Sequence, residues 1–246
     1  MGRETKIEPV AGTMTAIDKV LYLFEKEKGG VGSTGTLITI AHMLMMRGTP
    51  VEFIEASISQ LDVENAYGGH HAVHRVDLTG ADADERVIDI VAEAPEGARI
   101  FANVPGGRLA EIEAVHRLVR HANEGGFLSA RTEIVWTMGL DAASEATLRA
   151  LLGGELPGPV HLNLPAWIGG PAEFVALRDD ALVEQIEATG GTVFVTPSLP
   201  IQLYDRFRRD QIALDRLATT KGVTLGSRVA LSQWEKDVVT RLGDLF

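Results

Sequence analysis

The feature that most constrains the fold is a glycine-rich segment between a short apolar run and a longer one. Residues 20–24 are apolar and suit a buried strand, residues 29–35 contain four glycines, and residues 37–46 have apolar side chains at helical spacing. A strand, a glycine loop and a helix in this order turn backbone N–H groups toward one point, with the positive end of the helix behind them. The segment therefore predicts a phosphate-binding loop.

Strand-like runs alternate with helical patterns along the rest of the chain. The expected strands are residues 20–24, 51–54, 99–102, 133–137, 159–164 and 192–195. The expected helices are residues 37–46, 84–94, 109–121, 142–152, 172–189, 201–218 and 229–245. This alternation predicts an α/β fold with a mostly parallel sheet covered by helices on both faces. Ligands bind such sheets beyond the carboxyl ends of the strands, where the glycine loop lies.

The composition restricts the possible functions. We expect a flexible leader over residues 1–17 and one domain over residues 18–246. There is no cysteine, which excludes disulfides and thiolate metal sites, and no apolar run approaches the roughly 20 residues that span a bilayer. We therefore expect a cytoplasmic protein. The net charge of −11 disfavours a broad DNA-binding face.

A local basic patch remains open as a weak, non-specific DNA contact. The densest cluster of positive charge contains Arg206, Arg208 and Arg209. The favoured alternative is a solvated helix face, because aspartates flank the cluster.

The glycine loop permits two other interpretations. Gly30, Gly32 and Gly35 match the G-x-G-x-x-G pattern of dinucleotide-binding folds, and Glu55 lies about 20 residues further on, where those folds place a ribose-binding acid. Several charged residues separate the strand from Gly30, however, which favours a phosphate loop. A dinucleotide-dependent enzyme and a purely structural loop remain alternatives.

Residues 28–34 read K-G-G-V-G-S-T. This segment resembles the K-G-G-x-G-K-[ST] loop of the ParA/MinD family of deviant Walker A P-loop ATPases. The resemblance implies a P-loop NTPase fold in which Lys28 acts catalytically across a dimer interface and Thr34 binds Mg²⁺. Ser33 replaces the loop lysine. The residues implied to hold the phosphates of ATP or ADP are Lys28, Gly29, Gly30, Val31, Gly32, Ser33, Thr34 and Gly35.

Later strand ends resemble the family in the same order. Glu55 matches the first acid of a D-x-D-like element, which implies a role in positioning water or metal, whereas Ser57 replaces the second acid. Asn103 stands where the Walker B aspartate is expected. Asn163 and Pro197 match an asparagine and a proline-containing loop that meet the adenine base.

The departures from the family predict weak or absent hydrolysis. Ser33 has no charge, and losing a charge-assisted contact to phosphate costs roughly 1.5–3 kcal/mol. Asn103 lacks the negative charge that favours Mg²⁺. Phosphoryl transfer relies on positioning and charge stabilisation. Nucleotide binding without turnover is therefore the expectation, with Lys26 or Lys28 as a possible replacement for the missing lysine.

The resemblance implies a nucleotide-dependent switch. The expected form is a homodimer with an unidentified protein partner, active in plasmid or DNA partition, mobilisation, conjugative transfer or another cellular positioning process. One alternative is a pseudo-ATPase that serves as a protein-interaction scaffold. The second is a dinucleotide-binding oxidoreductase.

Three further features favour structural roles. His70 and His74 have the i, i+4 spacing of a metal site only if their segment is helical, and the preceding glycines favour a loop. Residues 231–246 have apolar side chains at helical spacing, which predicts a closing helix, with partner docking as the alternative. Core or interface positions are expected for Trp136, Trp167 and Trp234.

Overall fold

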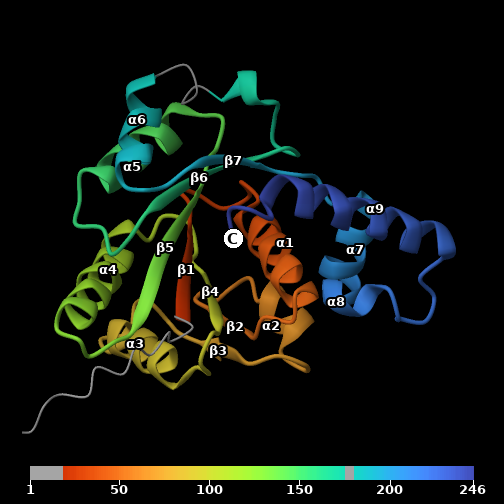
Figure 1. Ribbon diagram of the computed structural model, residues 1–246, viewed down its shortest axis with the longest axis horizontal. Helices are drawn as coiled ribbons and strands as arrows, with labels where there is room; N and C mark the ends of the chain where they lie inside the picture. The colour runs from red at the N-terminus through yellow and green to blue at the C-terminus, as the bar shows by residue number, and fades with distance from the viewer. Residues whose placement is uncertain (1–18, 175–179) are drawn as a thin grey trace, which may run out of the picture.

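The computed structural model describes residues 19–174 and 180–246. Seven strands form one sheet in the order β3-β2-β4-β1-β5-β6-β7, and every neighbouring pair is parallel (Figure 1). The strands are β1 (Lys19–Glu25), β2 (Val51–Glu55), β3 (Val73–Arg75), β4 (Arg99–Asn103), β5 (Ala130–Thr137), β6 (Val160–Pro165) and β7 (Val193–Thr196). The predicted α/β class with a parallel sheet is confirmed.

Helices cover both faces of the sheet (Figure 1). One face carries α1 (Ser33–Met46), α2 (Asp62–Tyr67), α7 (Ile201–Asp210), α8 (Leu214–Leu217) and α9 (Leu225–Leu242). The other carries α3 (Ala83–Glu93), α4 (Leu109–Glu124), α5 (Ala142–Leu152) and α6 (Asp180–Ala188). A 3₁₀ turn, η1 (Pro171–Glu173), follows β6. The domain thus has three layers.

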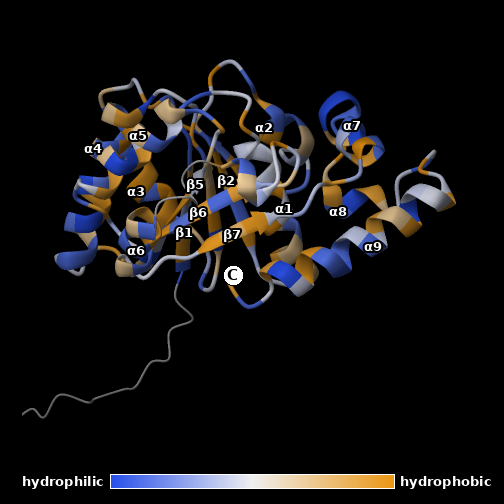
Figure 2. Ribbon diagram, turned by 90° about the horizontal axis from the view of Figure 1, so that it is seen from above, coloured by the Kyte–Doolittle hydropathy of each residue, from blue (hydrophilic) through white to orange (hydrophobic). Residues whose placement is uncertain are grey.

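The central strand shows why the sheet needs both layers of helices. Leu21 and Leu23 pack into the core under α3–α6, whereas Tyr22 and Phe24 pack into the core under α1 and α7–α9. Successive side chains of a strand point to opposite faces, so a continuous apolar run is buried on both sides. Figure 2 shows the resulting hydrophobic residues along the strands between the helices.

The strand order contradicts the dinucleotide alternative. In a dinucleotide-binding sheet the first strand neighbours the second, in the order 3-2-1-4-5-6. Here β4 lies between β2 and β1. The glycine loop and Glu55 therefore end strands that are not adjacent.

Two predicted helices were too long. The helix expected at 172–189 is wrong at its start, because η1 ends at Glu173 and Phe174 is extended and fully buried in the core. Residues 175–179 lie outside the described residues, and α6 begins at Asp180. The helix expected at 201–218 is divided at Gln211, whose φ of 55° ends α7 and lets Leu214 turn into the core. In both places burial of an apolar side chain overrides helical periodicity.

Two elements were missed, α2 and the edge strand β3. The chain turns after Tyr67, whose carbonyl accepts hydrogen bonds from the N–H groups of His70 and His71. His74 lies in β3, and its Nε2 is 3.0 Å from Glu52 Oε2. The helical arrangement that a metal site at His70 and His74 needs is therefore absent from this segment.

The ends of the chain differ in what the structure describes. The predicted leader, residues 1–17, lies outside the described residues. The predicted closing helix is α9, which begins at Leu225 and buries Leu231, Trp234 and Val238 against the core. None of the helices in the described ranges combines the length and apolarity that a membrane crossing requires.

Candidate functional site

A cavity of about 340 Å³ lies at the glycine loop, beyond the carboxyl end of β1. Four glycines and two hydroxyl residues of the loop and of the first turn of α1 line it: Gly29, Gly30, Gly32, Gly35, Ser33 and Thr34. The structure thus brings most of the predicted phosphate-binding residues to one hollow. Val31 is buried and lies outside the lining.

The start of α1 is free to bind an anion. Gly32 precedes the helix with a φ of 88°, and no side chain caps it. The first intrahelical bond runs from Thr36 N–H to Gly32 O, so the preceding N–H groups of the first turn have no intrahelical acceptor. The Ser33 hydroxyl is buried and has no hydrogen-bond partner in the part of the chain that the structure describes. These donors and the helix dipole fit a phosphate group.

Trp167, which follows β6, lies close against the loop. A Cβ on Gly32 would be 2.3 Å from Trp167 Nε1, and one on Gly35 would be 3.0 Å from Cζ2. At Gly32 the indole occupies the space of a side chain, and at Gly35 it leaves a tight fit. Trp167 is 38% exposed and lines the cavity, so of the two expected positions, core or interface, it does not occupy the core. The ring gives the cavity an aromatic wall.

Helix α7 contributes to the lining of the cavity. Ile201, Tyr204 and Arg208 line the cavity and are spaced i, i+3 and i+7, which places them on one helix face. Sequence reasoning missed this part of the lining. The available signal was the i, i+3, i+7 spacing of these residues in a helix that directly follows a strand. Such spacing does not reveal which part of the sheet the helix faces.

Lys26 brings a positive charge to the cavity. Its side chain is half-buried, lines the cavity and donates from Nζ to the carbonyl of Val104 at 2.7 Å. Burial lowers the pKa of Lys26 to about 8, and the ionised Glu55 opposes this shift. Lys26 follows β1 and Val104 follows β4, so neighbouring strands position the contact.

Lys28 points to a different partner. Its Nζ is 2.5 Å from Asp141 Oδ2, and both side chains are exposed. Asp141 also caps α5 by accepting from Ser144 N–H. The hydrogen bond between the pair raises the pKa of Lys28 and lowers that of Asp141. Lys28 does not line the cavity, and contact with a partner's phosphate requires breaking this ion pair.

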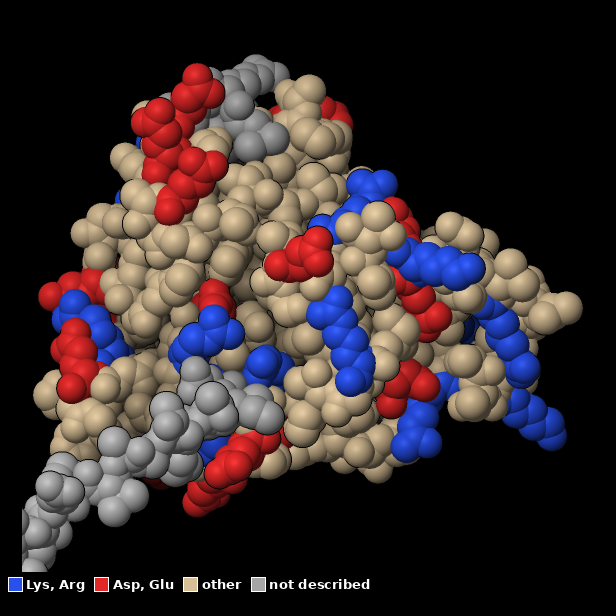
Figure 3. All heavy atoms as spheres, in the orientation of Figure 1, with Lys and Arg blue, Asp and Glu red and all other residues tan. Residues whose placement is uncertain are grey.

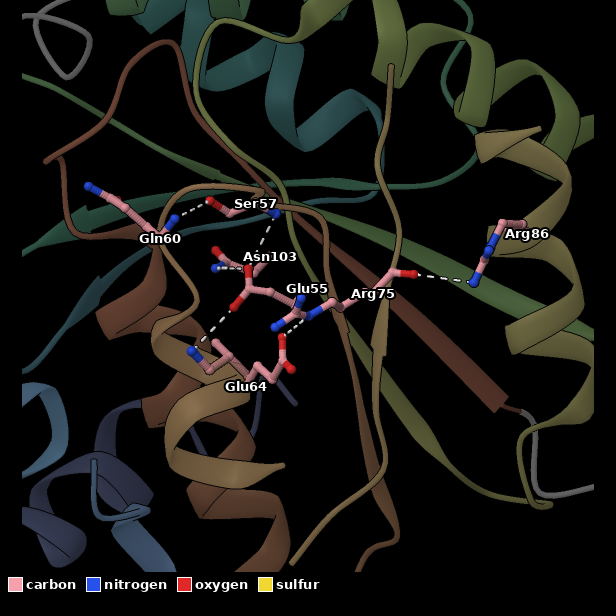
Figure 4. A network of polar contacts seen from close by, with 8 residues as sticks. Glu55, Ser57, Gln60, Glu64, Arg75, Arg86 and Asn103 are labelled. Carbon is pink, nitrogen blue, oxygen red and sulfur yellow. Dashed lines mark hydrogen bonds and ion pairs between the residues drawn. The ribbon is translucent and has the colours of Figure 1, made fainter. Parts of the chain in front are cut away.

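Thr34, Asn103 and Glu55 form a chain of hydrogen bonds beside the loop. Figure 4 shows the part of it that joins Asn103 to Glu55. Thr34 Oγ1 donates to Asn103 Oδ1 at 3.3 Å, and Asn103 Nδ2 donates to Glu55 Oε1 at 2.9 Å. Glu55 also accepts from the N–H groups of Ser57 and Val63, at 3.4 and 3.2 Å. Burial raises the pKa of Glu55 to about 7 although these bonds oppose the shift. Glu55 therefore ties β2 to the start of α2.

This chain of bonds explains why an amide suits position 103. An aspartate there would face the buried carboxylate of Glu55, and two like charges at that distance disfavour ionisation of both. Asn103 instead donates to Glu55 and accepts from Thr34. Mg²⁺ prefers carboxylate oxygens together with phosphates. Both Glu55 oxygens accept hydrogen bonds, and no group of three His, Asp or Glu among the described residues suits a metal ion, so these donors fit Mg²⁺ poorly.

Asn163 and Pro197 lie beneath the cavity instead of lining it. Asn163 is fully buried, donates from Nδ2 to Thr36 Oγ1 at 2.6 Å and accepts at Oδ1 from Thr196 at 2.7 Å. The Pro197 carbonyl accepts from Trp234 Nε1 at 3.5 Å. Both residues join β6 or β7 to the helices that cover them, and we leave them out of the proposed nucleotide contacts.

Asn163→Ala is expected to lower the free energy of unfolding by about 2 kcal/mol, because it leaves the Thr36 and Thr196 hydroxyls buried without this partner. Urea denaturation measures the change. Thr196→Val in the same background is the control, since it removes one stranded hydroxyl and recovers part of the loss. An Asn163→Ala protein of unchanged stability would instead leave the residue free for a base contact.

The predicted arginine patch is balanced by aspartates. Arg206 and Arg209 both pair with Asp210 at 3.1 Å, and Arg208 lies 3.6 Å from Asp62. Figure 3 shows positive and negative side chains interspersed on this face of the molecule. The contacts give no support to DNA binding through these arginines.

The fold can be compared with known proteins. No protein-family model matches the sequence. The chain is 20% identical over 219 residues to the protein named MobD from Acidithiobacillus ferrooxidans. The aligned region covers 89% of this chain and 94% of that protein. The septum site-determining protein MinD from Pyrococcus horikoshii, complexed with Mg-ADP, superposes with a TM-score of 0.52 at 11% identity, over 90% of this chain and 95% of that one. The chain has the MinD fold.

A second MinD structure is also similar. In the MinC:MinD cell division protein complex from Aquifex aeolicus, the matching chain has a TM-score of 0.48 and 13% identity, covering 91% of this chain and 96% of that one. The superposition on Pyrococcus horikoshii MinD confirms the P-loop NTPase fold expected from the ParA/MinD resemblance. In this MinD fold, the glycine loop joins the central strand β1 to α1.

Proposed function

We propose that this chain is a ParA/MinD-like nucleotide-binding switch that holds ATP or ADP and hydrolyses ATP slowly or not at all. The observation that carries the proposal is the uncapped start of α1, with the buried and unpartnered Ser33 hydroxyl, beside the 340 Å³ cavity. Trp167 and the apolar part of α7 offer a surface for a planar base. A MinD protein of the same fold was solved with Mg-ADP.

Slow hydrolysis follows from the charges near the loop. Ser33 brings no positive charge to the phosphates, and Asn103 brings no negative charge to a metal. Glu55 is the nearby acid, but Asn103 and two backbone N–H groups occupy its oxygens. A carboxylate held in this way is poorly placed to orient an attacking water.

We assign the switch to DNA mobilisation or partition. The similarity to MobD extends over nearly the whole of both chains and supports this assignment. We further propose that the protein is cytoplasmic and forms a homodimer on binding nucleotide. The homodimer then binds a further protein. The competing scaffold function needs no nucleotide. Because buried polar groups are normally hydrogen-bonded, the Ser33 hydroxyl, which has no partner among the described residues, favours a bound ligand over a scaffold.

The test is calorimetric titration with ATP, ADP and NAD⁺, with the mass of the protein followed by light scattering. We expect micromolar dissociation constants for ATP and ADP, no heat from NAD⁺, and a doubled mass with ATP. Absence of binding at millimolar ATP and ADP would replace the switch with the scaffold. Binding without a change in mass would retain the nucleotide site and remove the dimer.

A further inference from the structure

Bound triphosphate needs a cation, and Ser33 supplies none at the position of the usual loop lysine. Among the described residues that line the cavity, the cations are Lys26 and Arg208. Arg208 lies on α7, where it already pairs with Asp62. Lys26 stands at the start of the glycine loop.

Lys26 is placed to move onto a phosphate. Its Nζ donates to the neutral carbonyl of Val104 and makes no ion pair with a carboxylate in the described ranges. Replacing a neutral acceptor by a charged one strengthens the hydrogen bond, and the flexible stem of lysine allows the ammonium to shift. Lys28, in contrast, is already paired with Asp141 outside the cavity.

The metal position is unlike that of a magnesium site. Thr34 contributes a hydroxyl that is bonded to Asn103, and the adjacent acid, Glu55, is saturated with hydrogen bonds. Positive charge at the phosphates therefore has to come from the protein.

From this arrangement we propose that the Lys26 ammonium binds the nucleotide phosphates in place of both the lysine absent at position 33 and the magnesium ion. Nucleotide binding is then independent of magnesium. The inference rests on the proposed nucleotide site. It assigns the positive charge at the phosphates to Lys26, two positions before Lys28, the lysine that the family resemblance selects.

The experiment is titration of the full-length protein with ATP, in excess magnesium and in excess EDTA. We expect the two dissociation constants of the wild type to differ by less than about threefold, and Lys26→Met to weaken binding about 10- to 100-fold in both buffers. Lys19→Met is the matched control, because Lys19 also donates to backbone carbonyls, at the opposite end of β1. It should bind ATP as the wild type does. Lys26→Met/Ser33→Lys should regain at least about tenfold.

Each other outcome overturns a stated part. If Lys26→Met binds ATP with wild-type affinity, or if the expected loss appears in Lys28→Met and not in Lys26→Met, then Lys26 is not the phosphate ligand. The nucleotide site itself is retained in both cases. A magnesium effect above about tenfold on the wild type removes metal independence. No ATP binding by the wild type in either buffer retires both the inference and the proposed function.

A second measurement needs no variant. Acetylation of the wild-type protein, read by mass spectrometry, should be slowed at Lys26 by more than about tenfold when ATP in EDTA is present, and at Lys19 by less than about twofold. Equal acetylation of Lys26 with and without ATP, under conditions where calorimetry shows binding, overturns the proposal.

Discussion

Gly32→Ala is expected to lower the free energy of unfolding by about 3 kcal/mol. Gly32 has a φ of 88°, a conformation in which a Cβ costs roughly 1–2 kcal/mol. The new Cβ would also lie within 2.3–2.8 Å of three indole atoms of Trp167, so the ring must leave its place. Losing much of the buried surface of a tryptophan costs about a further 2 kcal/mol. Because the ring walls the cavity, we also expect weaker ATP binding.

Urea denaturation of matched variants separates the two costs. Gly48 has a φ of 76° with nothing within 4 Å of its added Cβ, so Gly48→Ala pays only the backbone cost of about 1 kcal/mol. In a Trp167→Ala background, Gly32→Ala should likewise cost only about 1 kcal/mol. Equal losses for Gly32→Ala and Gly48→Ala in the wild-type background would show that Trp167 does not rest on the loop.

Raising the pH from about 4.5 to about 7 is expected to cost the protein about 3 kcal/mol of stability through Glu55 alone. The pKa of this buried carboxyl is raised from its ordinary value of 4.5 to about 7. Between these values the unfolded chain releases the proton while the native protein retains it, so the free energy of unfolding falls as pH rises. Below about 4.5 both states hold the proton, and above about 7 both have lost it, so the contribution is then constant.

The measurement compares wild type with Glu55→Gln by urea denaturation at several pH values. The variant keeps the shape of the side chain but cannot ionise, and all other titrating groups are common to both proteins. Its stability relative to the wild type should rise by about 3 kcal/mol across this interval. Parallel stability curves would mean that Glu55 titrates in the folded protein with a pKa near its ordinary value.

Local patterns predicted most of the architecture. The apolar run of β1, the glycine loop and α1 are adjacent in sequence, and their order alone implies a helix N-terminus facing the end of a strand. The parallel sheet followed from alternating elements. The edge strand β3 was missed because three residues with two polar side chains carry no period, and it forms by pairing with β2. Its existence depends on pairing with β2, about 20 residues earlier in the chain.

The candidate site was predicted less completely than the fold. The residues of the loop were identifiable because they are consecutive. Trp167 and Tyr204 follow strands near the other edge of the sheet, and only the folded chain brings them against the loop. Asn163 lies within β6, two residues before its end, and the strand register buries its amide between Thr36 and Thr196. A position in the sequence does not say which way a side chain faces when both faces of the sheet are covered.

By itself, the sequence determined that this chain forms a parallel α/β domain with a phosphate loop, and that its loop lacks the usual lysine at Ser33. Both are matters of residue type and short spacing. Only the tertiary structure decided which lysine meets the cavity. Lys26 and Lys28 are two residues apart and equal in charge, but β4 supplies the carbonyl of Val104 to one and α5 supplies Asp141 to the other. Their environments are set by elements some 80 and 110 residues away, and packing of those elements, not local pattern, fixes where each charge lies.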